Sequence, residues 1–287
     1  MLAQDTDKPL ISRSHHLTRT ADYDSINKKE AHAMIANYHT HTTRCRHARG
    51  EDEEYVQAAL ERGLKILGFS DHTPYPFPGD YYSTFRMFPE ELADYVNSIR
   101  GLREKYADKI QIFLGLETEY YPAHFENLRE LLKDYPIDYM LLGQHALGNE
   151  KDEYFCGWPT EDVSILKRYV DQTMEGMNTG CFNCFAHPDL INFVGDPKIY
   201  KEQMRNLIRE AKSCNVPLEF NMVGLWTGRI YPNRLFWEMV AEEGAPAVQG
   251  IDAHNPPFLK EPDVDPKAAA YLEGLEISFM EKLPISY

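Results

Sequence analysis

The sequence predicts a single parallel α/β barrel, and three observations lead to that fold class. Short apolar runs of four to seven residues alternate along the chain with longer segments of helical periodicity, which is the pattern of repeated β–α units. The chain has 287 residues, which is near the lower size for one such barrel. No stretch rich in glycine, serine or proline divides the chain into two parts.

Seven segments have the length and apolar character of buried strands. They are residues 34–38, 66–70, 110–116, 139–142, 182–186, 218–221 and 247–251. Parallel strands need a crossover between them, so we expect a helix after each strand. Residues 1–30 lack this rhythm, and we therefore expect an N-terminal extension there, followed by one folded domain over residues 31–287.

Seven helices are predicted between and after these strands. They cover residues 51–62, 89–106, 123–133, 160–177, 197–213, 232–243 and 266–275. Gly63 follows the first helix as a typical C-terminal stop, and Pro89 suits the first turn of the second. The hydroxyl of Thr160 and the carboxylates of Glu161 and Asp162 favour the start of the fourth helix.

The composition excludes several kinds of partner. The formal net charge of −15 argues against nucleic acid, whose phosphates need a basic surface, and disfavours anionic membranes. No apolar run approaches the roughly eighteen residues that span a bilayer. The five irregularly spaced cysteines are typical of reduced thiols. We therefore expect a cytoplasmic protein with a small-molecule substrate, and the sequence does not indicate its oligomeric state.

Potential metal ligands follow six of the seven predicted strands. In chain order they are His39, His41 and His47, then His72, Glu117, His145 and His187, and finally Asp252 and His254. The carboxyl ends of all strands in a parallel barrel meet at one face. Ordinary core or surface histidines do not explain why seven of the eleven histidines fall there. Imidazoles and carboxylates in this number favour two or three divalent ions of zinc, manganese or iron over calcium.

These residues resemble the motifs of the polymerase-and-histidinol-phosphatase (PHP) superfamily. The resemblance follows family order over about residues 34–255, and residues 69–74 (FSDHTP), 115–120 (GLETEY), 142–145 (LGQH) and 219–221 (EFN) are similar to the monofunctional histidinol-phosphatases. It implies a distorted, TIM-like (β/α)7 barrel that hydrolyses L-histidinol phosphate in histidine biosynthesis. It also implies a trinuclear site, with one metal on His39, His41, Glu117 and Asp252, a second on Glu117, His145 and His187, and a third on His47, His72 and His254.

Several other side chains are candidates for the chemistry of phosphate hydrolysis. Asp71 is a candidate for protonating the leaving group, because the ligand histidines are not free to act as acids. Charge on the phosphoryl oxygens requires cations or directed donors beyond the metals. Arg229 and Arg86 are the first candidates, with Arg44 and Arg46 after them, and a solvated surface arginine is the alternative for each.

The leaving group of histidinol phosphate carries an amine and an imidazole, so its pocket should offer a carboxylate and flat surfaces. Glu119 lies two residues after Glu117 and would point the same way in an extended segment. Candidate walls are Tyr75, Tyr121, Phe88 and Trp226. Two other functions remain open: hydrolysis of a different small phosphomonoester, and a non-catalytic metal-binding accessory domain.

Overall fold

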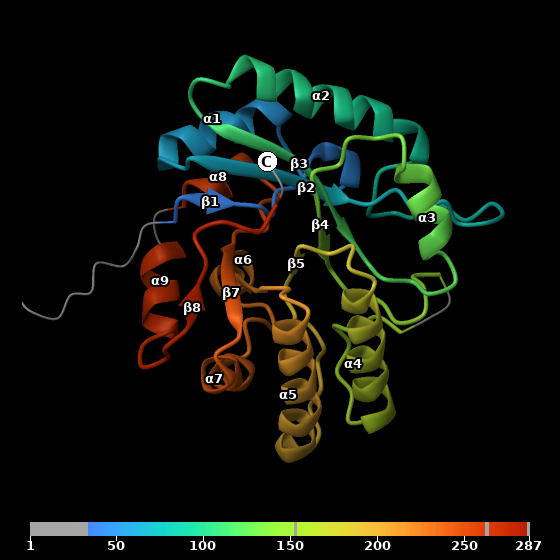
Figure 1. Ribbon diagram of the computed structural model, residues 1–287, viewed down its shortest axis with the longest axis vertical. Helices are drawn as coiled ribbons and strands as arrows, with labels where there is room; N and C mark the ends of the chain where they lie inside the picture. Colours follow the sequence, from blue (N-terminus) through green and yellow to red (C-terminus); the bar gives the residue numbers. More distant parts are fainter. Residues whose placement is uncertain (1–33, 152–153, 262–263, 286–287) are drawn as a thin grey trace, which may run out of the picture. The chain divides into compact units, whose positions relative to one another are not determined.

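A parallel sheet of eight strands lies at the centre of the computed structural model, which describes residues 34–151, 154–261 and 264–285. The strands follow chain order (Figure 1): β1 (Ala36–Asn37), β2 (Ile66–His72), β3 (Gln111–Thr118), β4 (Tyr139–Leu142), β5 (Cys184–Phe185), β6 (Leu218–Asn221), β7 (Pro246–Gly250) and β8 (Ser278–Phe279). The predicted boundary after residue 30 lies outside the described residues.

The sheet curls so that the chain after β1 meets the chain after β7. Thr40 pairs with Ala253 in a parallel bridge, and the Ala253 N–H donates to the His39 carbonyl at 3.1 Å. The His41 N–H donates in turn to the Ala253 carbonyl at 2.9 Å. These contacts close a distorted α/β barrel, which confirms the predicted fold class.

The prediction of seven strands was one too few. Residues Ser278–Phe279 form β8, which pairs with the beginning of β7 at Pro246 and Ala247. Two partly exposed residues leave no apolar run or alternation in the sequence, so the pairing depends on the neighbouring strand. The strands predicted at residues 34–38 and 182–186 are shorter in the structure. Only Ala36–Asn37 and Cys184–Phe185 pair as regular strands there, because strand length also depends on the neighbouring strand.

Helices cover the outside of the sheet (Figure 1). They are α1 (Asp52–Arg62), α2 (Leu92–Lys105), α3 (Phe125–Leu132), α4 (Val163–Asn178), α5 (Pro197–Ser213), α6 (Met222–Thr227), α7 (Arg234–Glu243), α8 (Pro256–Leu259) and α9 (Val264–Tyr271). The short α6 and α8 were not predicted. The helix predicted from residue 160 begins at Val163, because Asp162 caps it by accepting the Ser164 N–H at 2.7 Å. Among the described residues, no helix is long and apolar enough to cross a membrane.

The burial pattern of the longest strands explains where the polar site lies. Every residue of β2 is buried, and its sequence changes from apolar at Ile66 and Leu67 to polar at Ser70, Asp71 and His72. The helices on the outside of the sheet turn apolar stripes inward, as in α5, whose buried residues recur at helical spacing. The apolar half of each strand therefore anchors the barrel, while the carboxyl ends carry the ligand-type side chains.

Candidate metal centre and active site

The Glu117 carboxylate stands at the centre of a cluster of histidines at the carboxyl ends of the strands. Its Oε2 lies 3.1 Å from His72 Nδ1, 3.4 Å from His39 Nε2 and 3.5 Å from His41 Nε2. Its Oε1 lies 2.8 Å from His187 Nε2 and 3.5 Å from His145 Nε2. Strands far apart in the sequence thus deliver five imidazoles to one carboxylate.

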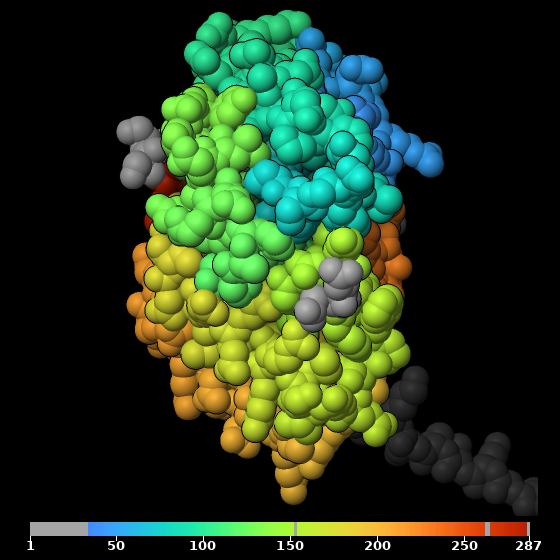
Figure 2. Space-filling model, turned by 90° about the vertical axis from the view of Figure 1, so that its right-hand side faces the viewer, coloured from blue at the N-terminus to red at the C-terminus, as the bar shows by residue number. Residues whose placement is uncertain are grey.

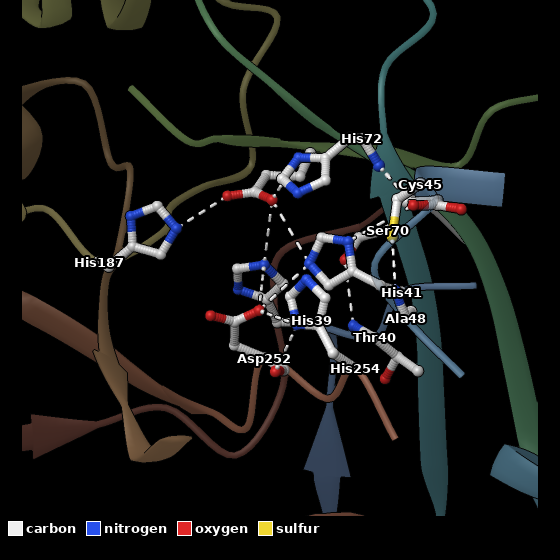
Figure 3. Close-up of polar contacts among 12 residues, drawn as sticks. His39, Thr40, His41, Cys45, Ala48, Ser70, His72, His187, Asp252 and His254 are labelled. Carbon is white, nitrogen blue, oxygen red and sulfur yellow. Dashed lines mark hydrogen bonds and ion pairs between the residues drawn. The ribbon is translucent and has the colours of Figure 1, made fainter. Parts of the chain in front are cut away.

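Asp252 and His254 join the same cluster (Figure 3), and His47 reaches it through His254. Asp252 Oδ1 lies 3.2 Å from His41 Nε2, and His254 Nε2 lies 2.9 Å from His47 Nε2. Groups whose donor atoms all fall within 4.8 Å of one another include His39/His41/Asp252, His39/Glu117/His187, His41/His72/Glu117 and His47/His72/His254. All nine predicted ligands therefore lie close together. The group His47/His72/His254 coincides with one of the three expected sets and His39/His41/Asp252 with part of another, whereas the other two groups combine residues of different sets.

The buried polar atoms of the cluster fit divalent ions. Within the described residues, His39 Nε2, His41 Nε2, His72 Nδ1 and Asp252 Oδ1 are buried and have no hydrogen-bond partner. Buried polar atoms nearly always have partners, because an unpaired one costs free energy. Ions of zinc, manganese or iron among these nitrogen and oxygen donors would supply the missing interactions.

The second ring nitrogen of several predicted ligands makes a hydrogen bond on the side away from the cluster. Nδ1 of His39 lies 2.8 Å from Glu219 Oε1, and Nδ1 of His145 lies 2.8 Å from Glu119 Oε1. His47 uses the Cys45 carbonyl in the same way, at 2.8 Å. Such partners fix the tautomer and the ring orientation of a metal-binding histidine, so the opposite nitrogen of each ring faces the cluster.

Glu219 is a residue of the site that the sequence prediction missed, since no ligand was expected at the sixth strand. Its side chain is buried and also accepts the His187 N–H at 3.1 Å. The available signal was a carboxylate inside the short strand Leu218–Asn221, where every position is buried. A charged residue there needs a partner, because burying an unpaired charge is costly.

We expect Glu219→Gln to weaken metal binding by about 10- to 100-fold, because an amide cannot supply the charge that orients His39 and makes it a better ligand. Competition with a chromogenic chelator would measure the affinity. Glu238→Gln is the matched control, since Glu238 pairs with Arg234 on the exposed face of α7. Equal affinities of the two variants would contradict the role assigned to Glu219.

The backbone around the cluster is shaped to admit these side chains. A methyl group at Gly143 would collide with the Glu117 carboxylate, so a glycine is required where the chain leaves β4. His187 and Asp252 adopt positive φ angles of 32° and 59°, a region that costs a residue with a side chain about 1–2 kcal/mol. Strained conformations at two ligands indicate that the site dictates the backbone there.

Carboxylates raise the pKa of the two histidines that follow β1. Burial lowers the pKa of His39, but the charges of Glu219, Asp252 and Glu117 outweigh it and raise that pKa well above its usual value. Burial is likewise overcome at His41, where the nearby carboxylates of Asp252, Asp71 and Glu117 raise the pKa to about 9. Without metal, these imidazoles therefore hold protons at neutral pH.

It follows that metal binding should release protons and strengthen as the pH rises. Below a raised pKa the imidazole is protonated, and a metal ion must displace that proton. Affinity should therefore fall by up to about tenfold per pH unit for each displaced proton on going from about pH 8 to about pH 6. Chelator competition at both pH values tests this, and an unchanged affinity would contradict it.

A cavity of about 690 Å³ lies over the cluster, within the size range of small-molecule sites. Its lining includes the ligands His47, His72, Glu117, His145, His187, Asp252 and His254. The remaining wall is mostly apolar, with Phe85, Phe155, Trp158 and Ile230 among its residues. Polar groups are few, and those beyond the ligands include Glu150, Arg229 and Tyr231.

Of the predicted non-ligand residues, Arg229 reaches this cavity and Asp71 does not. The Arg229 side chain is 46% exposed, donates to the Tyr231 hydroxyl at 2.5 Å and lies 3.8 Å from Asp252 Oδ2. Asp71 is fully buried behind His41, with its Oδ1 3.5 Å from the ring Nδ1, and it accepts the Thr42 hydroxyl. The geometry favours Asp71 as an orienting partner of His41 over a proton donor to the leaving group.

Arg86, Glu119 and Tyr75 also lie behind the cavity wall and are absent from its lining. The Arg86 guanidinium is buried between two carboxylates. It donates to Glu119 Oε1 at 3.1 Å and also pairs with Glu150. The Tyr75 hydroxyl donates to the Glu119 carbonyl. Arg86 belongs to the long segment between β2 and α2, drawn in cyan in Figure 2 beside the yellow-green residues that follow β4. These three residues therefore support the wall in this structure and do not line the cavity.

Comparisons with known proteins agree with this geometry. The model of the PHP domain family matches residues 37–222. A probable histidinol-phosphatase of Deinococcus radiodurans is 31% identical over 232 residues, covering 77% of this chain and 87% of the relative. One of Schizosaccharomyces pombe is 28% identical, covering 78% of this chain and 81% of the relative. The crystal structure of histidinol phosphate phosphatase from Lactococcus lactis, complexed with zinc, L-histidinol and phosphate, superposes with a TM-score of 0.68 at 19% identity, covering 87% of this chain and 98% of that one.

Proposed function

The chain belongs to the PHP domain family, and from that premise we propose that it hydrolyses L-histidinol phosphate to L-histidinol and phosphate, a step of histidine biosynthesis. The observation that carries the proposal is the convergence of nine predicted metal ligands, seven of which line the floor of one cavity. The two probable histidinol-phosphatases, each aligned over more than three quarters of this chain, support the choice of substrate.

The phosphate group belongs at the floor of the cavity. Two or three divalent ions held there would supply Lewis acidity toward the phosphoryl oxygens and make water a stronger nucleophile at neutral pH. Arg229 is placed to add a protein cation, because its guanidinium lies on the cavity wall beside Asp252 and is half exposed. Its contact with the Tyr231 hydroxyl fixes its direction. Charge that develops on the phosphoryl oxygens is stabilised by a cation oriented in advance.

Other residues act by holding ligands in place. Asp71 orients His41, and Glu119 orients His145 while Arg86 compensates its charge. In this arrangement the imidazoles need not reorganise when substrate arrives, because their hydrogen bonds are made in advance. The roles of these three residues are thus positioning roles.

A reducing compartment such as the cytoplasm suits the protein. All five cysteines lie within the described residues and are free thiols, and Cys45, Cys156 and Cys184 are buried. Disulfides form and persist in the oxidising environment of secreted proteins, whereas cytosolic proteins keep their thiols reduced.

Phosphate release from L-histidinol phosphate, measured beside a panel of other phosphomonoesters with manganese- or zinc-loaded protein, tests the proposed function. We expect a strong preference for L-histidinol phosphate and its loss in His39→Ala, which removes a ligand. Hydrolysis of other esters but not of L-histidinol phosphate would keep the phosphoesterase chemistry and contradict the proposed substrate. Failure to hydrolyse any ester, including a chromogenic one, would favour a metal-binding accessory domain.

A further inference from the structure

We propose that Glu150 binds the ammonium group of the substrate and that Phe155 and Trp158 cover its imidazole, which together form a subsite for the leaving group. The inference rests on the proposed function and names the residues that recognise the amine. The sequence prediction assigned this role to Glu119, and no role to Glu150, Phe155 or Trp158.

Glu150 differs from the other carboxylates of the cavity. Among the described residues that line it, Glu117 and Asp252 are the other two carboxylates, and both belong to the candidate metal centre. Glu150 lies five residues after His145, on the segment that leaves β4, and its side chain is only 3% exposed. It is therefore a carboxylate of the cavity wall that is not one of the predicted metal ligands.

The buried charges of this wall do not balance when His145, the neighbour of Glu119, is a neutral metal ligand. Arg86 is shared by Glu119 and Glu150, so two carboxylates face one guanidinium. Glu150 Oε2 is occupied by Arg86, whose Nε lies 2.9 Å away, while Oε1 accepts the Tyr81 hydroxyl at 3.1 Å. A carboxylate oxygen can accept a second hydrogen bond. An ammonium group in the cavity would donate this second hydrogen bond to Oε1 and compensate the excess negative charge.

Exposed apolar side chains gather beside Glu150. Phe155, Trp158 and Ile230 are 42%, 56% and 42% exposed, and all three line the cavity. Trp158 packs edge-on against Phe155, with ring centroids 6.0 Å apart. Large exposed apolar groups that gather at one place mark binding surfaces, and aromatic faces bind flat or cationic rings. An imidazole next to an ammonium group matches both features of this wall.

The test compares L-histidinol phosphate with its deamino analogue, 3-(imidazol-4-yl)propyl phosphate, in metal-loaded protein. Wild-type protein should prefer the amine by about 10- to 100-fold in kcat/KM, as expected for a hydrogen bond to a charged group. Glu150→Gln should lose most of that preference, mainly through KM, and should hydrolyse the deamino ester within about threefold of wild type. Glu126→Gln is the matched control, because its side chain is 80% exposed on α3.

The outcomes separate this subsite from the proposed function. Wild-type protein that does not hydrolyse L-histidinol phosphate overturns both. Wild-type protein that hydrolyses both esters equally well overturns the subsite alone, and this measurement needs no variant to fold. Equal losses on both esters in Glu150→Gln would show that Glu150 only supports the wall through Arg86, and would also overturn the subsite. Loss confined to the amine-bearing ester supports it.

Discussion

Glu117→Gln should lower kcat/KM for any phosphomonoester by about 1,000-fold or more, a loss typical of removing a central electrostatic group. The carboxylate has five histidine nitrogens within 3.5 Å, shared between its two oxygens. An amide of the same shape keeps one acceptor oxygen and replaces the other by an NH₂ group, which repels cations. The substitution therefore removes the anion that links two of the three ligand sets.

Metal content and activity should fall together in this variant. Metal analysis after dialysis, followed by phosphate release at saturating manganese, would separate weak binding from impaired chemistry. Glu126→Gln again serves as the control, since it removes an exposed carboxylate and should leave both quantities unchanged. A fully active Glu117→Gln protein with wild-type metal content would contradict the central place of Glu117.

The metal centre was the most predictable part of the molecule. Every ligand except His47, which lies on a loop, follows closely after an apolar run, and parallel strands bring their carboxyl ends to one face. That rule alone predicted that His39, Glu117 and Asp252, which are distant in sequence, would meet. Their assignment to three sets came from the family resemblance, and one donor group in the structure, His47/His72/His254, coincides with one of those sets.

The wall of the cavity was less predictable, because its residues come from long connections without periodicity. Glu119 has the spacing to point with Glu117, yet it follows the end of β3 and turns to His145 and Arg86. Glu150 and Tyr231 lie in connections where a sequence pattern gives no direction. Only the fold shows which side chain of such a connection faces the cavity.

Arg86→Met should destabilise the protein by about 3–5 kcal/mol, because breaking a buried ion pair leaves charge without compensation. Arg86 is 1% exposed, and methionine would fill much of its volume without supplying charge. Burial raises the pKa of Glu119, and Arg86 with His145 outweighs it and holds that pKa below its usual value. Without the guanidinium, Glu119 and Glu150 would face each other's charge in the wall.

The loss should appear as a fall in Tm of roughly 10 °C, measured by thermal unfolding at neutral pH. The pH dependence identifies its cause. Removal of Arg86 should raise the folded-state pKa of Glu119, so the stability of the variant relative to wild type should recover as the pH falls and Glu119 binds a proton. Arg129→Met, in an exposed pair with Glu126, should change stability by less than about 1 kcal/mol. If Arg86→Met behaved like this control, Arg86 would not be what holds Glu119 and Glu150 in the wall.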